Sequence, residues 1–193
     1  MEKEEFARLF DEMMADRREE MRQRFDRVLP SGETIFNRFD KGRYLACGDG
    51  SSVYDTSVVM GRVEIGSHVW VGPYTVLEGS GAKLKIGDHV SIAAGTCIYT
   101  HDSTRNYVSG GADPFETGEV TIGSHTVIGT MCMIGCGVRI GDHCVIGAHS
   151  FVNRDVPDCS IAAGIPAKVI GRVVIREDGH ADFEYFDRED GKA

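Results

Sequence analysis

The chain has 193 residues and a net charge of −9, and its sequence contains no apolar run long enough to cross a membrane. The length suits one solid core with appendages, and the negative charge argues against nucleic acid or an anionic membrane as a partner, because both require basic patches. The N-terminal segment MEKEEFARLF is too charged for a signal peptide, and the six cysteines show no C-x-x-C spacing. We therefore predict a cytoplasmic protein whose cysteines are reduced thiols.

The N-terminal part has a helical pattern. Apolar residues recur among many charged ones from 3 to 29, at the spacing of one amphipathic helix or two, and Pro30 ends the pattern. The dipeptides Ser31-Gly32 and Lys41-Gly42 interrupt the segment that follows. Residues 1–45 are therefore predicted to form a helical cap and a linker.

The chain beyond this cap is organised around a repeat of six residues. From Ile122 to Pro157 the sequence reads IGSHTV-IGTMCM-IGCGVR-IGDHCV-IGAHSF-VNRDVP, and every hexad opens with Ile or Val. A helix would need apolar residues about every 3.6 positions and a strand every two, so a period of six fits a solenoid of short flat sides. Three such sides make a coil of about 18 residues, and the hexad openers point inward and stack in a continuous aliphatic column.

The repeat is clean from Ile65 onward except at two places. The segment from Leu77 to Lys85 holds three residues too many, and residues 102–119 form an irregular loop that leaves and re-enters at one corner. A loop of this length is uncommon in a regular solenoid unless it has a function. We predict a solenoid domain over 46–170 with an excursion loop at 102–119. An acidic tail over 171–193 is predicted to hold an edge strand or a packing segment.

The hexads resemble those of the hexapeptide-repeat acyltransferases, in particular the branch that O-acetylates galactosides and xenobiotics. The resemblance covers at least Ile65 to Pro157, about half of the chain. It implies a mainly β fold, a left-handed parallel β-helix with an N-terminal α-helical cap and a short C-terminal tail. It also implies a homotrimer with active sites between subunits and acetyl-CoA as the acyl donor.

Five of the seven histidines fall into two groups. Four of them stand three places after an Ile opener and in register with the coil, which predicts equivalent, solvated corners: His68, His89, His125 and His143. His101 lies instead where the loop leaves the coil, and Asp102 follows it. In the resembling enzymes a histidine at this place is the catalytic base, and an unperturbed pKa of about 6.5 suits removal of a hydroxyl proton. Asp102 would orient His101 or bind the acceptor. The alternative to catalysis for His101 is a structural role, in which its hydrogen bond anchors the loop.

The resemblance also supplies positions for the acyl donor. In the family the pantetheine arm lies in a groove bounded by small residues, and a lysine reaches a phosphate. The segment AAGIPAKVIG, from Ala162 to Gly171, matches the family's closing motif. The positions that match are Thr130, Ala148, Asn153, Ala163, Gly164, Pro166 and Lys168. Tight packing is an equally good account of each small residue.

Acceptor contacts are expected from aromatic residues, whose faces suit the apolar faces of sugar rings, and from polar loop residues. The candidates are Trp70, Tyr99, Arg105 and Asn106. We expect Trp70 at a corner between two hexads, where it projects outward. Subunit packing is an equally good account of this side chain.

Taken together, the sequence predicts an acetyltransferase that moves acetyl from acetyl-CoA to a hydroxyl, or an amine, of a sugar-like or nucleotide-sugar acceptor, without a metal. One alternative is a zinc enzyme like the γ-class carbonic anhydrases, which needs three neutral imidazoles on one metal. Most histidines here share one corner, which counts against it. The other alternative is a non-catalytic trimeric scaffold, against which His101 and the closing motif count.

Overall fold

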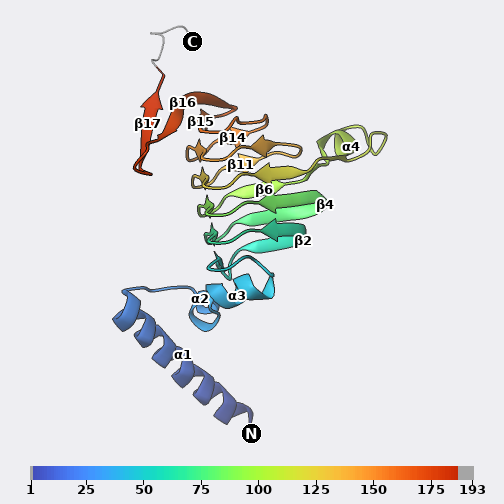
Figure 1. Cartoon of the computed structure of the whole chain (residues 1–193). Coiled ribbons are helices and arrows are strands. Elements are labelled where there is room, and N and C mark those ends of the chain that lie inside the picture. Colours follow the sequence, from blue (N-terminus) through green and yellow to red (C-terminus); the bar gives the residue numbers. More distant parts are fainter. Residues whose placement is uncertain (1, 187–193) are drawn as a thin grey trace.

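The computed structural model describes residues 2–186 and shows a tall stack of short strands with a helical cap at its N-terminal end (Figure 1). A C-terminal hairpin closes the opposite end, and one small helix projects from the side of the stack. In the eight-stranded sheet the strands follow one another in rising order but skip numbers, so the chain leaves this sheet and returns to it as a coil does.

The described helices are α1 (Lys3–Phe25), α2 (Ser31–Ile35), α3 (Arg38–Tyr44) and α4 (Thr104–Val108). The strands of the coil are β1 (Ser52–Val53), β2 (Val58–Ile65), β3 (Trp70–Val71), β4 (Val76–Ile86), β5 (Ser91–Ile92), β6 (Cys97–Tyr99), β9 (Val120–Ile122), β10 (Val127–Ile128), β11 (Met133–Ile134), β12 (Arg139–Ile140), β13 (Val145–Ile146) and β14 (Phe151–Val152). The excursion loop adds β7 (His101–Asp102) and β8 (Glu116–Thr117), and the C-terminal strands are β15 (Ser160–Gly164), β16 (Ala167–Ile175) and β17 (Ala181–Tyr185).

Parallel pairing arranges the coil in three faces. Face A holds β1, β3, β5, β10, β13 and β15, and face B holds the first halves of β2 and β4 with β6, β11 and β14. Face C holds the second halves of β2 and β4 with β9 and β12. We name the corners AB, BC and CA in chain order. Val127 pairs with Val145 and Met133 with Phe151, 18 residues apart in each case, which confirms the predicted three-sided coil.

The core is the column of inward-pointing hexad openers. They are at most 1% exposed over the six consecutive hexads: Ile122, Ile128, Ile134, Ile140, Ile146 and Val152. Side chains at the corners are also buried, and the hydroxyl of Thr126 donates to the carbonyl of Gly141 (2.9 Å). Cys132 and Cys144 are buried as predicted, and all six cysteines are free thiols.

The outward columns of faces B and C differ in polarity. Face B presents an apolar column, Val58, Val76, Cys97, Met133 and Phe151, whose members are half-buried or exposed. Face C presents charged and polar residues instead, Glu64, Lys85, Thr121 and Arg139. Of these two faces, B is therefore the one that gains more from being covered.

Two details of the corners agree with the predictions. The CA corner carries the four predicted histidines in the left-handed backbone region, with rings stacked at centroid separations of 4.6, 5.1 and 4.7 Å. At the BC corner, β4 has four residues (80–83) between its paired positions where β2 has only residue 62, which gives the three extra residues.

The helical cap is fastened to the first coil by polar contacts. Helix α1 ends at Phe25, earlier than the predicted pattern, because Asp26 turns to the left-handed region with φ 51°. Lys41 of α3 donates to the carbonyls of Tyr54, Asp55 and Ser57 at 2.6–3.1 Å. These contacts hold α3 against the start of the coil, whereas α1 extends away from it (Figure 1).

The C-terminal strands close the prism differently from the coil. β15 continues face A, and β16 and β17 then add to it in antiparallel order, so β17 is the edge strand. The predicted boundary between residues 170 and 171 falls inside β16. Residues 187–193 of the predicted acidic tail lie outside the described residues.

Candidate active site

The excursion loop is closed at its root on the BC corner of the third coil. The N–H of Gly118 donates to the carbonyl of Thr100 (3.0 Å), and β7 pairs with β8 through His101 and Thr117. Between these strands α4 carries the loop away from the prism (Figure 1). His101 therefore stands at the fixed end of the loop, with its side chain 33% exposed.

A buried glutamate, which sequence analysis did not identify, binds the ring of His101. Oε2 of Glu78 lies 2.9 Å from Nδ1 of the imidazole, and Glu78 is 2% exposed. Glu78 comes from β4, where it pairs in register with Tyr99. The same oxygen also accepts from the N–H and the hydroxyl of Thr100, and the other oxygen accepts from the N–H of Ser80. The carboxylate is thus fixed by several donors besides His101.

These donors keep Glu78 ionised. Burial by itself would raise the pKa of Glu78, but the hydrogen bonds from Thr100, His101 and Ser80 outweigh burial and lower this pKa to about 2. An ionised carboxylate can only accept, so Nδ1 of His101 must be the donor. The imidazole is therefore held in the tautomer that leaves the lone pair on Nε2, and within residues 2–186 the only hydrogen bond of this ring is the one at Nδ1.

Asp102 was predicted either to orient His101 or to bind the acceptor. The first of these roles is wrong, because Glu78 occupies Nδ1 of His101. The carboxylate of Asp102 instead accepts from the N–H of Thr104 (2.7 Å) at the start of α4. The hydrogen bonds from Thr104 lower the pKa of Asp102, and it stays exposed. Asp102 therefore shapes the first turn of the loop.

Aromatic rings surround His101 on the outer side. Tyr99, a predicted acceptor contact, meets the imidazole edge to face at 6.2 Å between centroids. Phe115, which sequence analysis missed, is stacked on the imidazole at 6.3 Å, and Tyr107 of α4 meets Phe115 at 6.2 Å. Phe115 and Tyr107 are 49% and 75% exposed, so both present apolar surface beside the candidate base.

The predicted polar acceptor residues are used inside the loop. Arg105 pairs with Glu116, with Nε and Oε1 2.9 Å apart, and the Asn106 amide donates to the carbonyl of Asp113 (2.6 Å). Both contacts join α4 to the segment that returns to the coil. In this structure these two contacts order the loop.

The predicted donor residues gather at a different corner. Thr130 and Ala148 lie one above the other at the AB corner, where the N–H of His149 donates to the carbonyl of Thr130 (2.9 Å). Ala163, Gly164, Pro166 and Lys168 follow at the same end of face A, in the hairpin between β15 and β16. Asn153 is the exception and lies at the BC corner, in the column of Tyr99. A single chain therefore does not bring most of the predicted donor residues to His101.

Trp70 does not occupy a corner, so this prediction is wrong. It lies in β3 on face A and meets Tyr54 edge to face at 6.0 Å between centroids. The reason is that Trp70 precedes the inward-pointing Val71, and the residue before an inward one in a strand points outward from the flat side. Trp70 thus lies on the one face that does not border the BC corner.

A metal-binding cluster and a membrane-spanning helix are both absent from residues 2–186. Within 2–186, no group of three or more His, Cys, Asp or Glu side chains is placed to hold a metal ion. The histidines of the CA corner stack one coil apart and do not converge as the zinc alternative requires. In the same range, no helix combines the length and the apolar character that a membrane crossing needs.

Known proteins share both the repeat and the fold. Residues 119–154 match the family described as bacterial transferase hexapeptide (six repeats). Galactoside O-acetyltransferase of Escherichia coli K12 is 45% identical over 58 residues, which is 30% of this chain and 29% of that protein. dTDP-4-amino-4,6-dideoxy-D-glucose acyltransferase of Escherichia coli is 31% identical over 117 residues, 57% of this chain and 60% of that protein. The match thus spans less than two thirds of the length of these two relatives.

Two solved structures extend the likeness. A hexapeptide-repeat acetyltransferase from Vibrio cholerae, complexed with acetyl-CoA, has a TM-score of 0.63 and 26% identity over 83% of this chain and 87% of its own. AntD, an N-acyltransferase from Bacillus cereus in complex with dTDP and 3-hydroxybutyryl-CoA, has a TM-score of 0.59 and 27% identity over 64% of this chain and 70% of its own. These neighbours confirm the predicted fold class, a left-handed parallel β-helix with an N-terminal helix. By its repeat, its coil and these relatives, the chain is similar to the hexapeptide-repeat acetyltransferases.

Proposed function

We propose that this protein is an acyltransferase that moves acetyl from acetyl-CoA to a hydroxyl, or an amine, of a sugar-like acceptor, with His101 as general base. The observation that carries the proposal is the buried, ionised Glu78 on Nδ1 of His101. A histidine that only anchored the loop would not need an ionised carboxylate behind it, because β7–β8 pairing and the Thr100–Gly118 bond already close the loop.

The pair supports a direct transfer. The proton of the acceptor moves to Nε2 of His101 as the acceptor oxygen or nitrogen attacks the thioester carbonyl carbon. The bond between carbon and sulfur then breaks, and the imidazolium returns the proton to the departing thiolate. Glu78 stabilises the imidazolium between these events, and a positioned base of this kind contributes about 10²–10⁴ to the rate.

The separation of the two corners supports a site shared between subunits. His101 at the BC corner and Thr130 and Ala148 at the AB corner lie on either side of face B. Face B carries the apolar column, in which Val58 and Met133 are 46% and 42% exposed. If this face packs against a neighbouring copy, the AB corner of one copy comes beside the BC corner of the next. We therefore include a homotrimer, the state expected from the resemblance, in the proposal.

The donor and the acceptor are proposed from the relatives and from the surfaces near His101. Neighbouring structures hold acetyl-CoA or an acyl-CoA, and the exposed Lys168 suits a phosphate of that donor. The relatives include a galactoside O-acetyltransferase and an acyltransferase of a dTDP-sugar. Tyr99 and Phe115 beside His101 suit the apolar face of a sugar ring. We propose a sugar or a nucleotide sugar as the acceptor and favour its hydroxyl.

The test is thiol release from acetyl-CoA with a panel of sugars, amino sugars and nucleotide sugars. We expect acceptor-dependent release that His101→Ala lowers by about 10²–10⁴-fold, while the variant still binds coenzyme A in calorimetry. His125→Ala is the matched control, because this residue lies on the CA corner, and it should keep wild-type rates. Release that survives His101→Ala would remove His101 as the base, and a protein that binds no coenzyme A is not an acyltransferase.

The subunit arrangement has its own measurement. Met133→Glu places a charge in the apolar column of face B without touching His101 or the predicted donor residues. We expect light scattering to show a trimer for the wild type and a smaller species for this variant, with a matching loss of thiol release. Arg139→Glu on face C should leave the mass unchanged, and a wild-type protein that is monomeric at assay concentration would contradict the shared site.

A further inference from the structure

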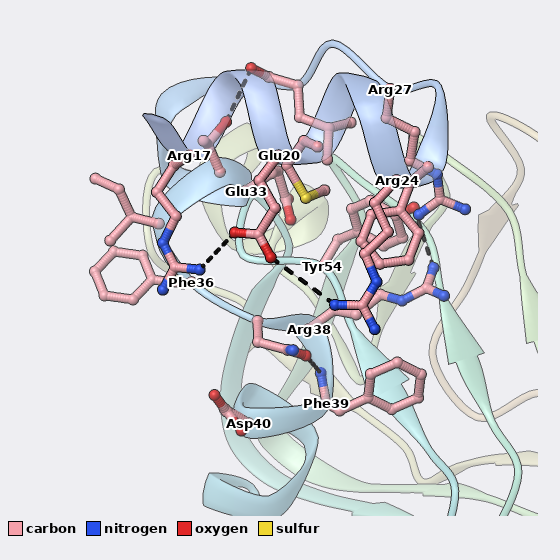
Figure 2. Close-up of a pocket in the computed structure, with 16 residues that line it drawn as sticks. Arg17, Glu20, Arg24, Arg27, Glu33, Phe36, Arg38, Phe39, Asp40 and Tyr54 are labelled. Carbon is pink, nitrogen blue, oxygen red and sulfur yellow. Dashed lines mark hydrogen bonds and ion pairs between the residues drawn. The ribbon is translucent and has the colours of Figure 1, made fainter. Parts of the chain in front are cut away.

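A pocket lies between the helical cap and the first coil, away from the candidate active site. Figure 2 shows it enclosed by α1, the turn after it, α2 and α3, with Tyr54 of the first coil at its floor. Its volume is about 420 Å³, within the range of small-molecule sites. The pocket lies at the first coil and His101 at the third, roughly 10 Å further along the axis at 4.8 Å per coil.

Four arginines line this pocket in a chain whose net charge is −9: Arg17, Arg24, Arg27 and Arg38. Figure 2 shows the guanidinium ends of Arg24, Arg27 and Arg38 gathered on one side of the pocket. Like charges gathered on one side of a pocket repel one another, so this arrangement favours an anion between them.

The carboxylates of the pocket do not neutralise these arginines. Glu20 serves two of them at once, Arg17 at 3.2 Å and Arg24 at 3.9 Å. The buried Glu33 accepts from the N–H and the hydroxyl of Thr56, and Asp40 is paired with Arg43 outside the pocket. That leaves two guanidinium groups without a carboxylate.

Those two groups are Arg27 and Arg38. Among residues 2–186, Arg27 has neither an ion pair nor a side-chain hydrogen bond, and Arg38 donates only to the Tyr54 hydroxyl (3.2 Å). Both therefore keep donors for a ligand. Guanidinium groups of this kind bind phosphate through paired N–H donors.

Aromatic rings accompany the arginines. Arg38 lies over the ring of Phe39 at 5.1 Å and over that of Tyr54 at 5.4 Å. Phe36 and Phe39 line the pocket and remain 57% and 40% exposed. Exposed aromatic faces beside guanidinium planes offer a flat ring a place to stack.

We propose that this pocket binds a nucleoside diphosphate, with the diphosphate between Arg27 and Arg38 and the base stacked on Phe36 or Phe39. An inorganic anion would explain the arginines but not the exposed rings, and an apolar ligand would explain the rings but not the charge. The site is distinct from the acyl-transfer site, and the proposal does not depend on that activity.

The test is calorimetric titration of the full chain with UDP, dTDP and ADP in turn, and with inorganic pyrophosphate. We expect one nucleotide site per chain that depends on Arg38, in addition to any binding at the proposed acceptor site. Binding in this pocket should weaken as salt rises, and pyrophosphate should bind there more weakly than the best nucleotide. Arg27→Ala and Arg38→Ala should each weaken nucleotide binding by about tenfold or more. Arg27 is exposed and has no partner in the described chain, so its variant should fold normally.

Two controls separate this pocket from other sites. Arg22 stands on α1 near Arg24 but points to Glu19 and does not line the pocket, so Arg22→Ala should bind nucleotide like the wild type. Arg105→Ala in the excursion loop should also have no effect. Binding that Arg105→Ala weakens and Arg38→Ala does not would place the nucleotide at the acceptor site. That result would overturn the proposal. It would also be overturned if pyrophosphate bound as tightly as any nucleotide, or if no nucleotide bound at all.

Discussion

Replacing Glu78 by glutamine tests the proposed base without touching the base itself. Glu78→Gln keeps the shape of the side chain but removes its charge and turns one oxygen into an NH₂ group. One oxygen of Glu78 serves Thr100 and His101, and the other serves Ser80, so the new NH₂ group must face a donor in either orientation. The substitution therefore weakens support for the imidazolium and leaves at least one buried donor unpaired.

The size of the effect follows from these contacts. A hydrogen bond to a charged group contributes about 1.5–3 kcal/mol and a neutral one about 0.5–1.5 kcal/mol. Loss of the carboxylate from the imidazolium should therefore cost the transition state about 2 kcal/mol, which is about 30-fold in kcat. The unpaired donor should lower the free energy of unfolding by about 1–3 kcal/mol, so rates must be measured where circular dichroism shows a folded variant.

The assay is steady-state thiol release, with kcat and KM for acetyl-CoA determined separately. We expect kcat to fall about 30-fold and KM for acetyl-CoA to stay within about twofold, because the hydrogen bonds of Glu78 go to Ser80, Thr100 and His101 and to none of the predicted donor residues. Glu64→Gln is the matched control, since this exposed carboxylate pairs with Lys83 on face C. It should leave both constants unchanged.

A double variant decides whether Glu78 acts through His101. Adding Glu78→Gln to His101→Ala should slow the reaction no further, because the carboxylate then has no imidazolium to stabilise. A folded Glu78→Gln protein with nearly full kcat would refute the reasoning. The reasoning would also be refuted if Glu78→Gln slowed the His101→Ala variant by as large a factor as it slows the wild type.

Three further outcomes test the fold and its titration. The pKa of Glu78 is lowered from 4.5 to about 2 in the folded chain, so its stabilising effect is complete above about pH 5 and disappears as pH falls towards 2. Over that window the free energy of unfolding of the wild type, measured with urea, should fall by about 3 kcal/mol, and that of Glu78→Gln should not show this fall. Ile134→Ala, in the aliphatic column, should lower the free energy of unfolding by about 2–5 kcal/mol, whereas Met133→Ala, its outward neighbour, should cost under about 1 kcal/mol in the monomer. Gly61→Ala should destabilise far more than Gly110→Ala in thermal melts, because both have positive φ but only at Gly61 would the added Cβ meet the backbone of the next coil; equal losses would mean that backbone strain alone decides.

The coil could be predicted from the sequence because the same pattern of buried and corner positions repeats every six residues. An opener such as Ile134 must be buried once six hexads stay in register, and a histidine such as His125 then falls at the same corner as His143. The three extra residues of β4 were predicted for the same reason, since they are a measurable departure from the period. His101 was identified because it stands where the period stops.

The partners of His101 were harder to find. Glu78 is separated from it by 23 residues, and the contact depends on how the irregular corner of one coil stacks on the next. A signal existed, because adding three extra residues to an 18-residue coil places Glu78 opposite Tyr99. Phe115 gave no such signal, since the loop has no period and its return path depends on contacts such as Arg105 with Glu116. Trp70 was misplaced because the pattern of six does not itself say where each corner begins.

The hydrogen bond between Thr100 and Gly118 has a consequence for how the excursion loop can vary. Because the two ends of the excursion loop meet, the loop can be lengthened, shortened or exchanged without moving any coil above or below it. Each doubling of loop length adds only about 0.6 kcal/mol of closure entropy, so natural variation at this position is nearly neutral for the stability of the stack. Insertions and deletions between residues 103 and 116 can therefore change the surface beside His101, while His101 and the AB corner keep their places.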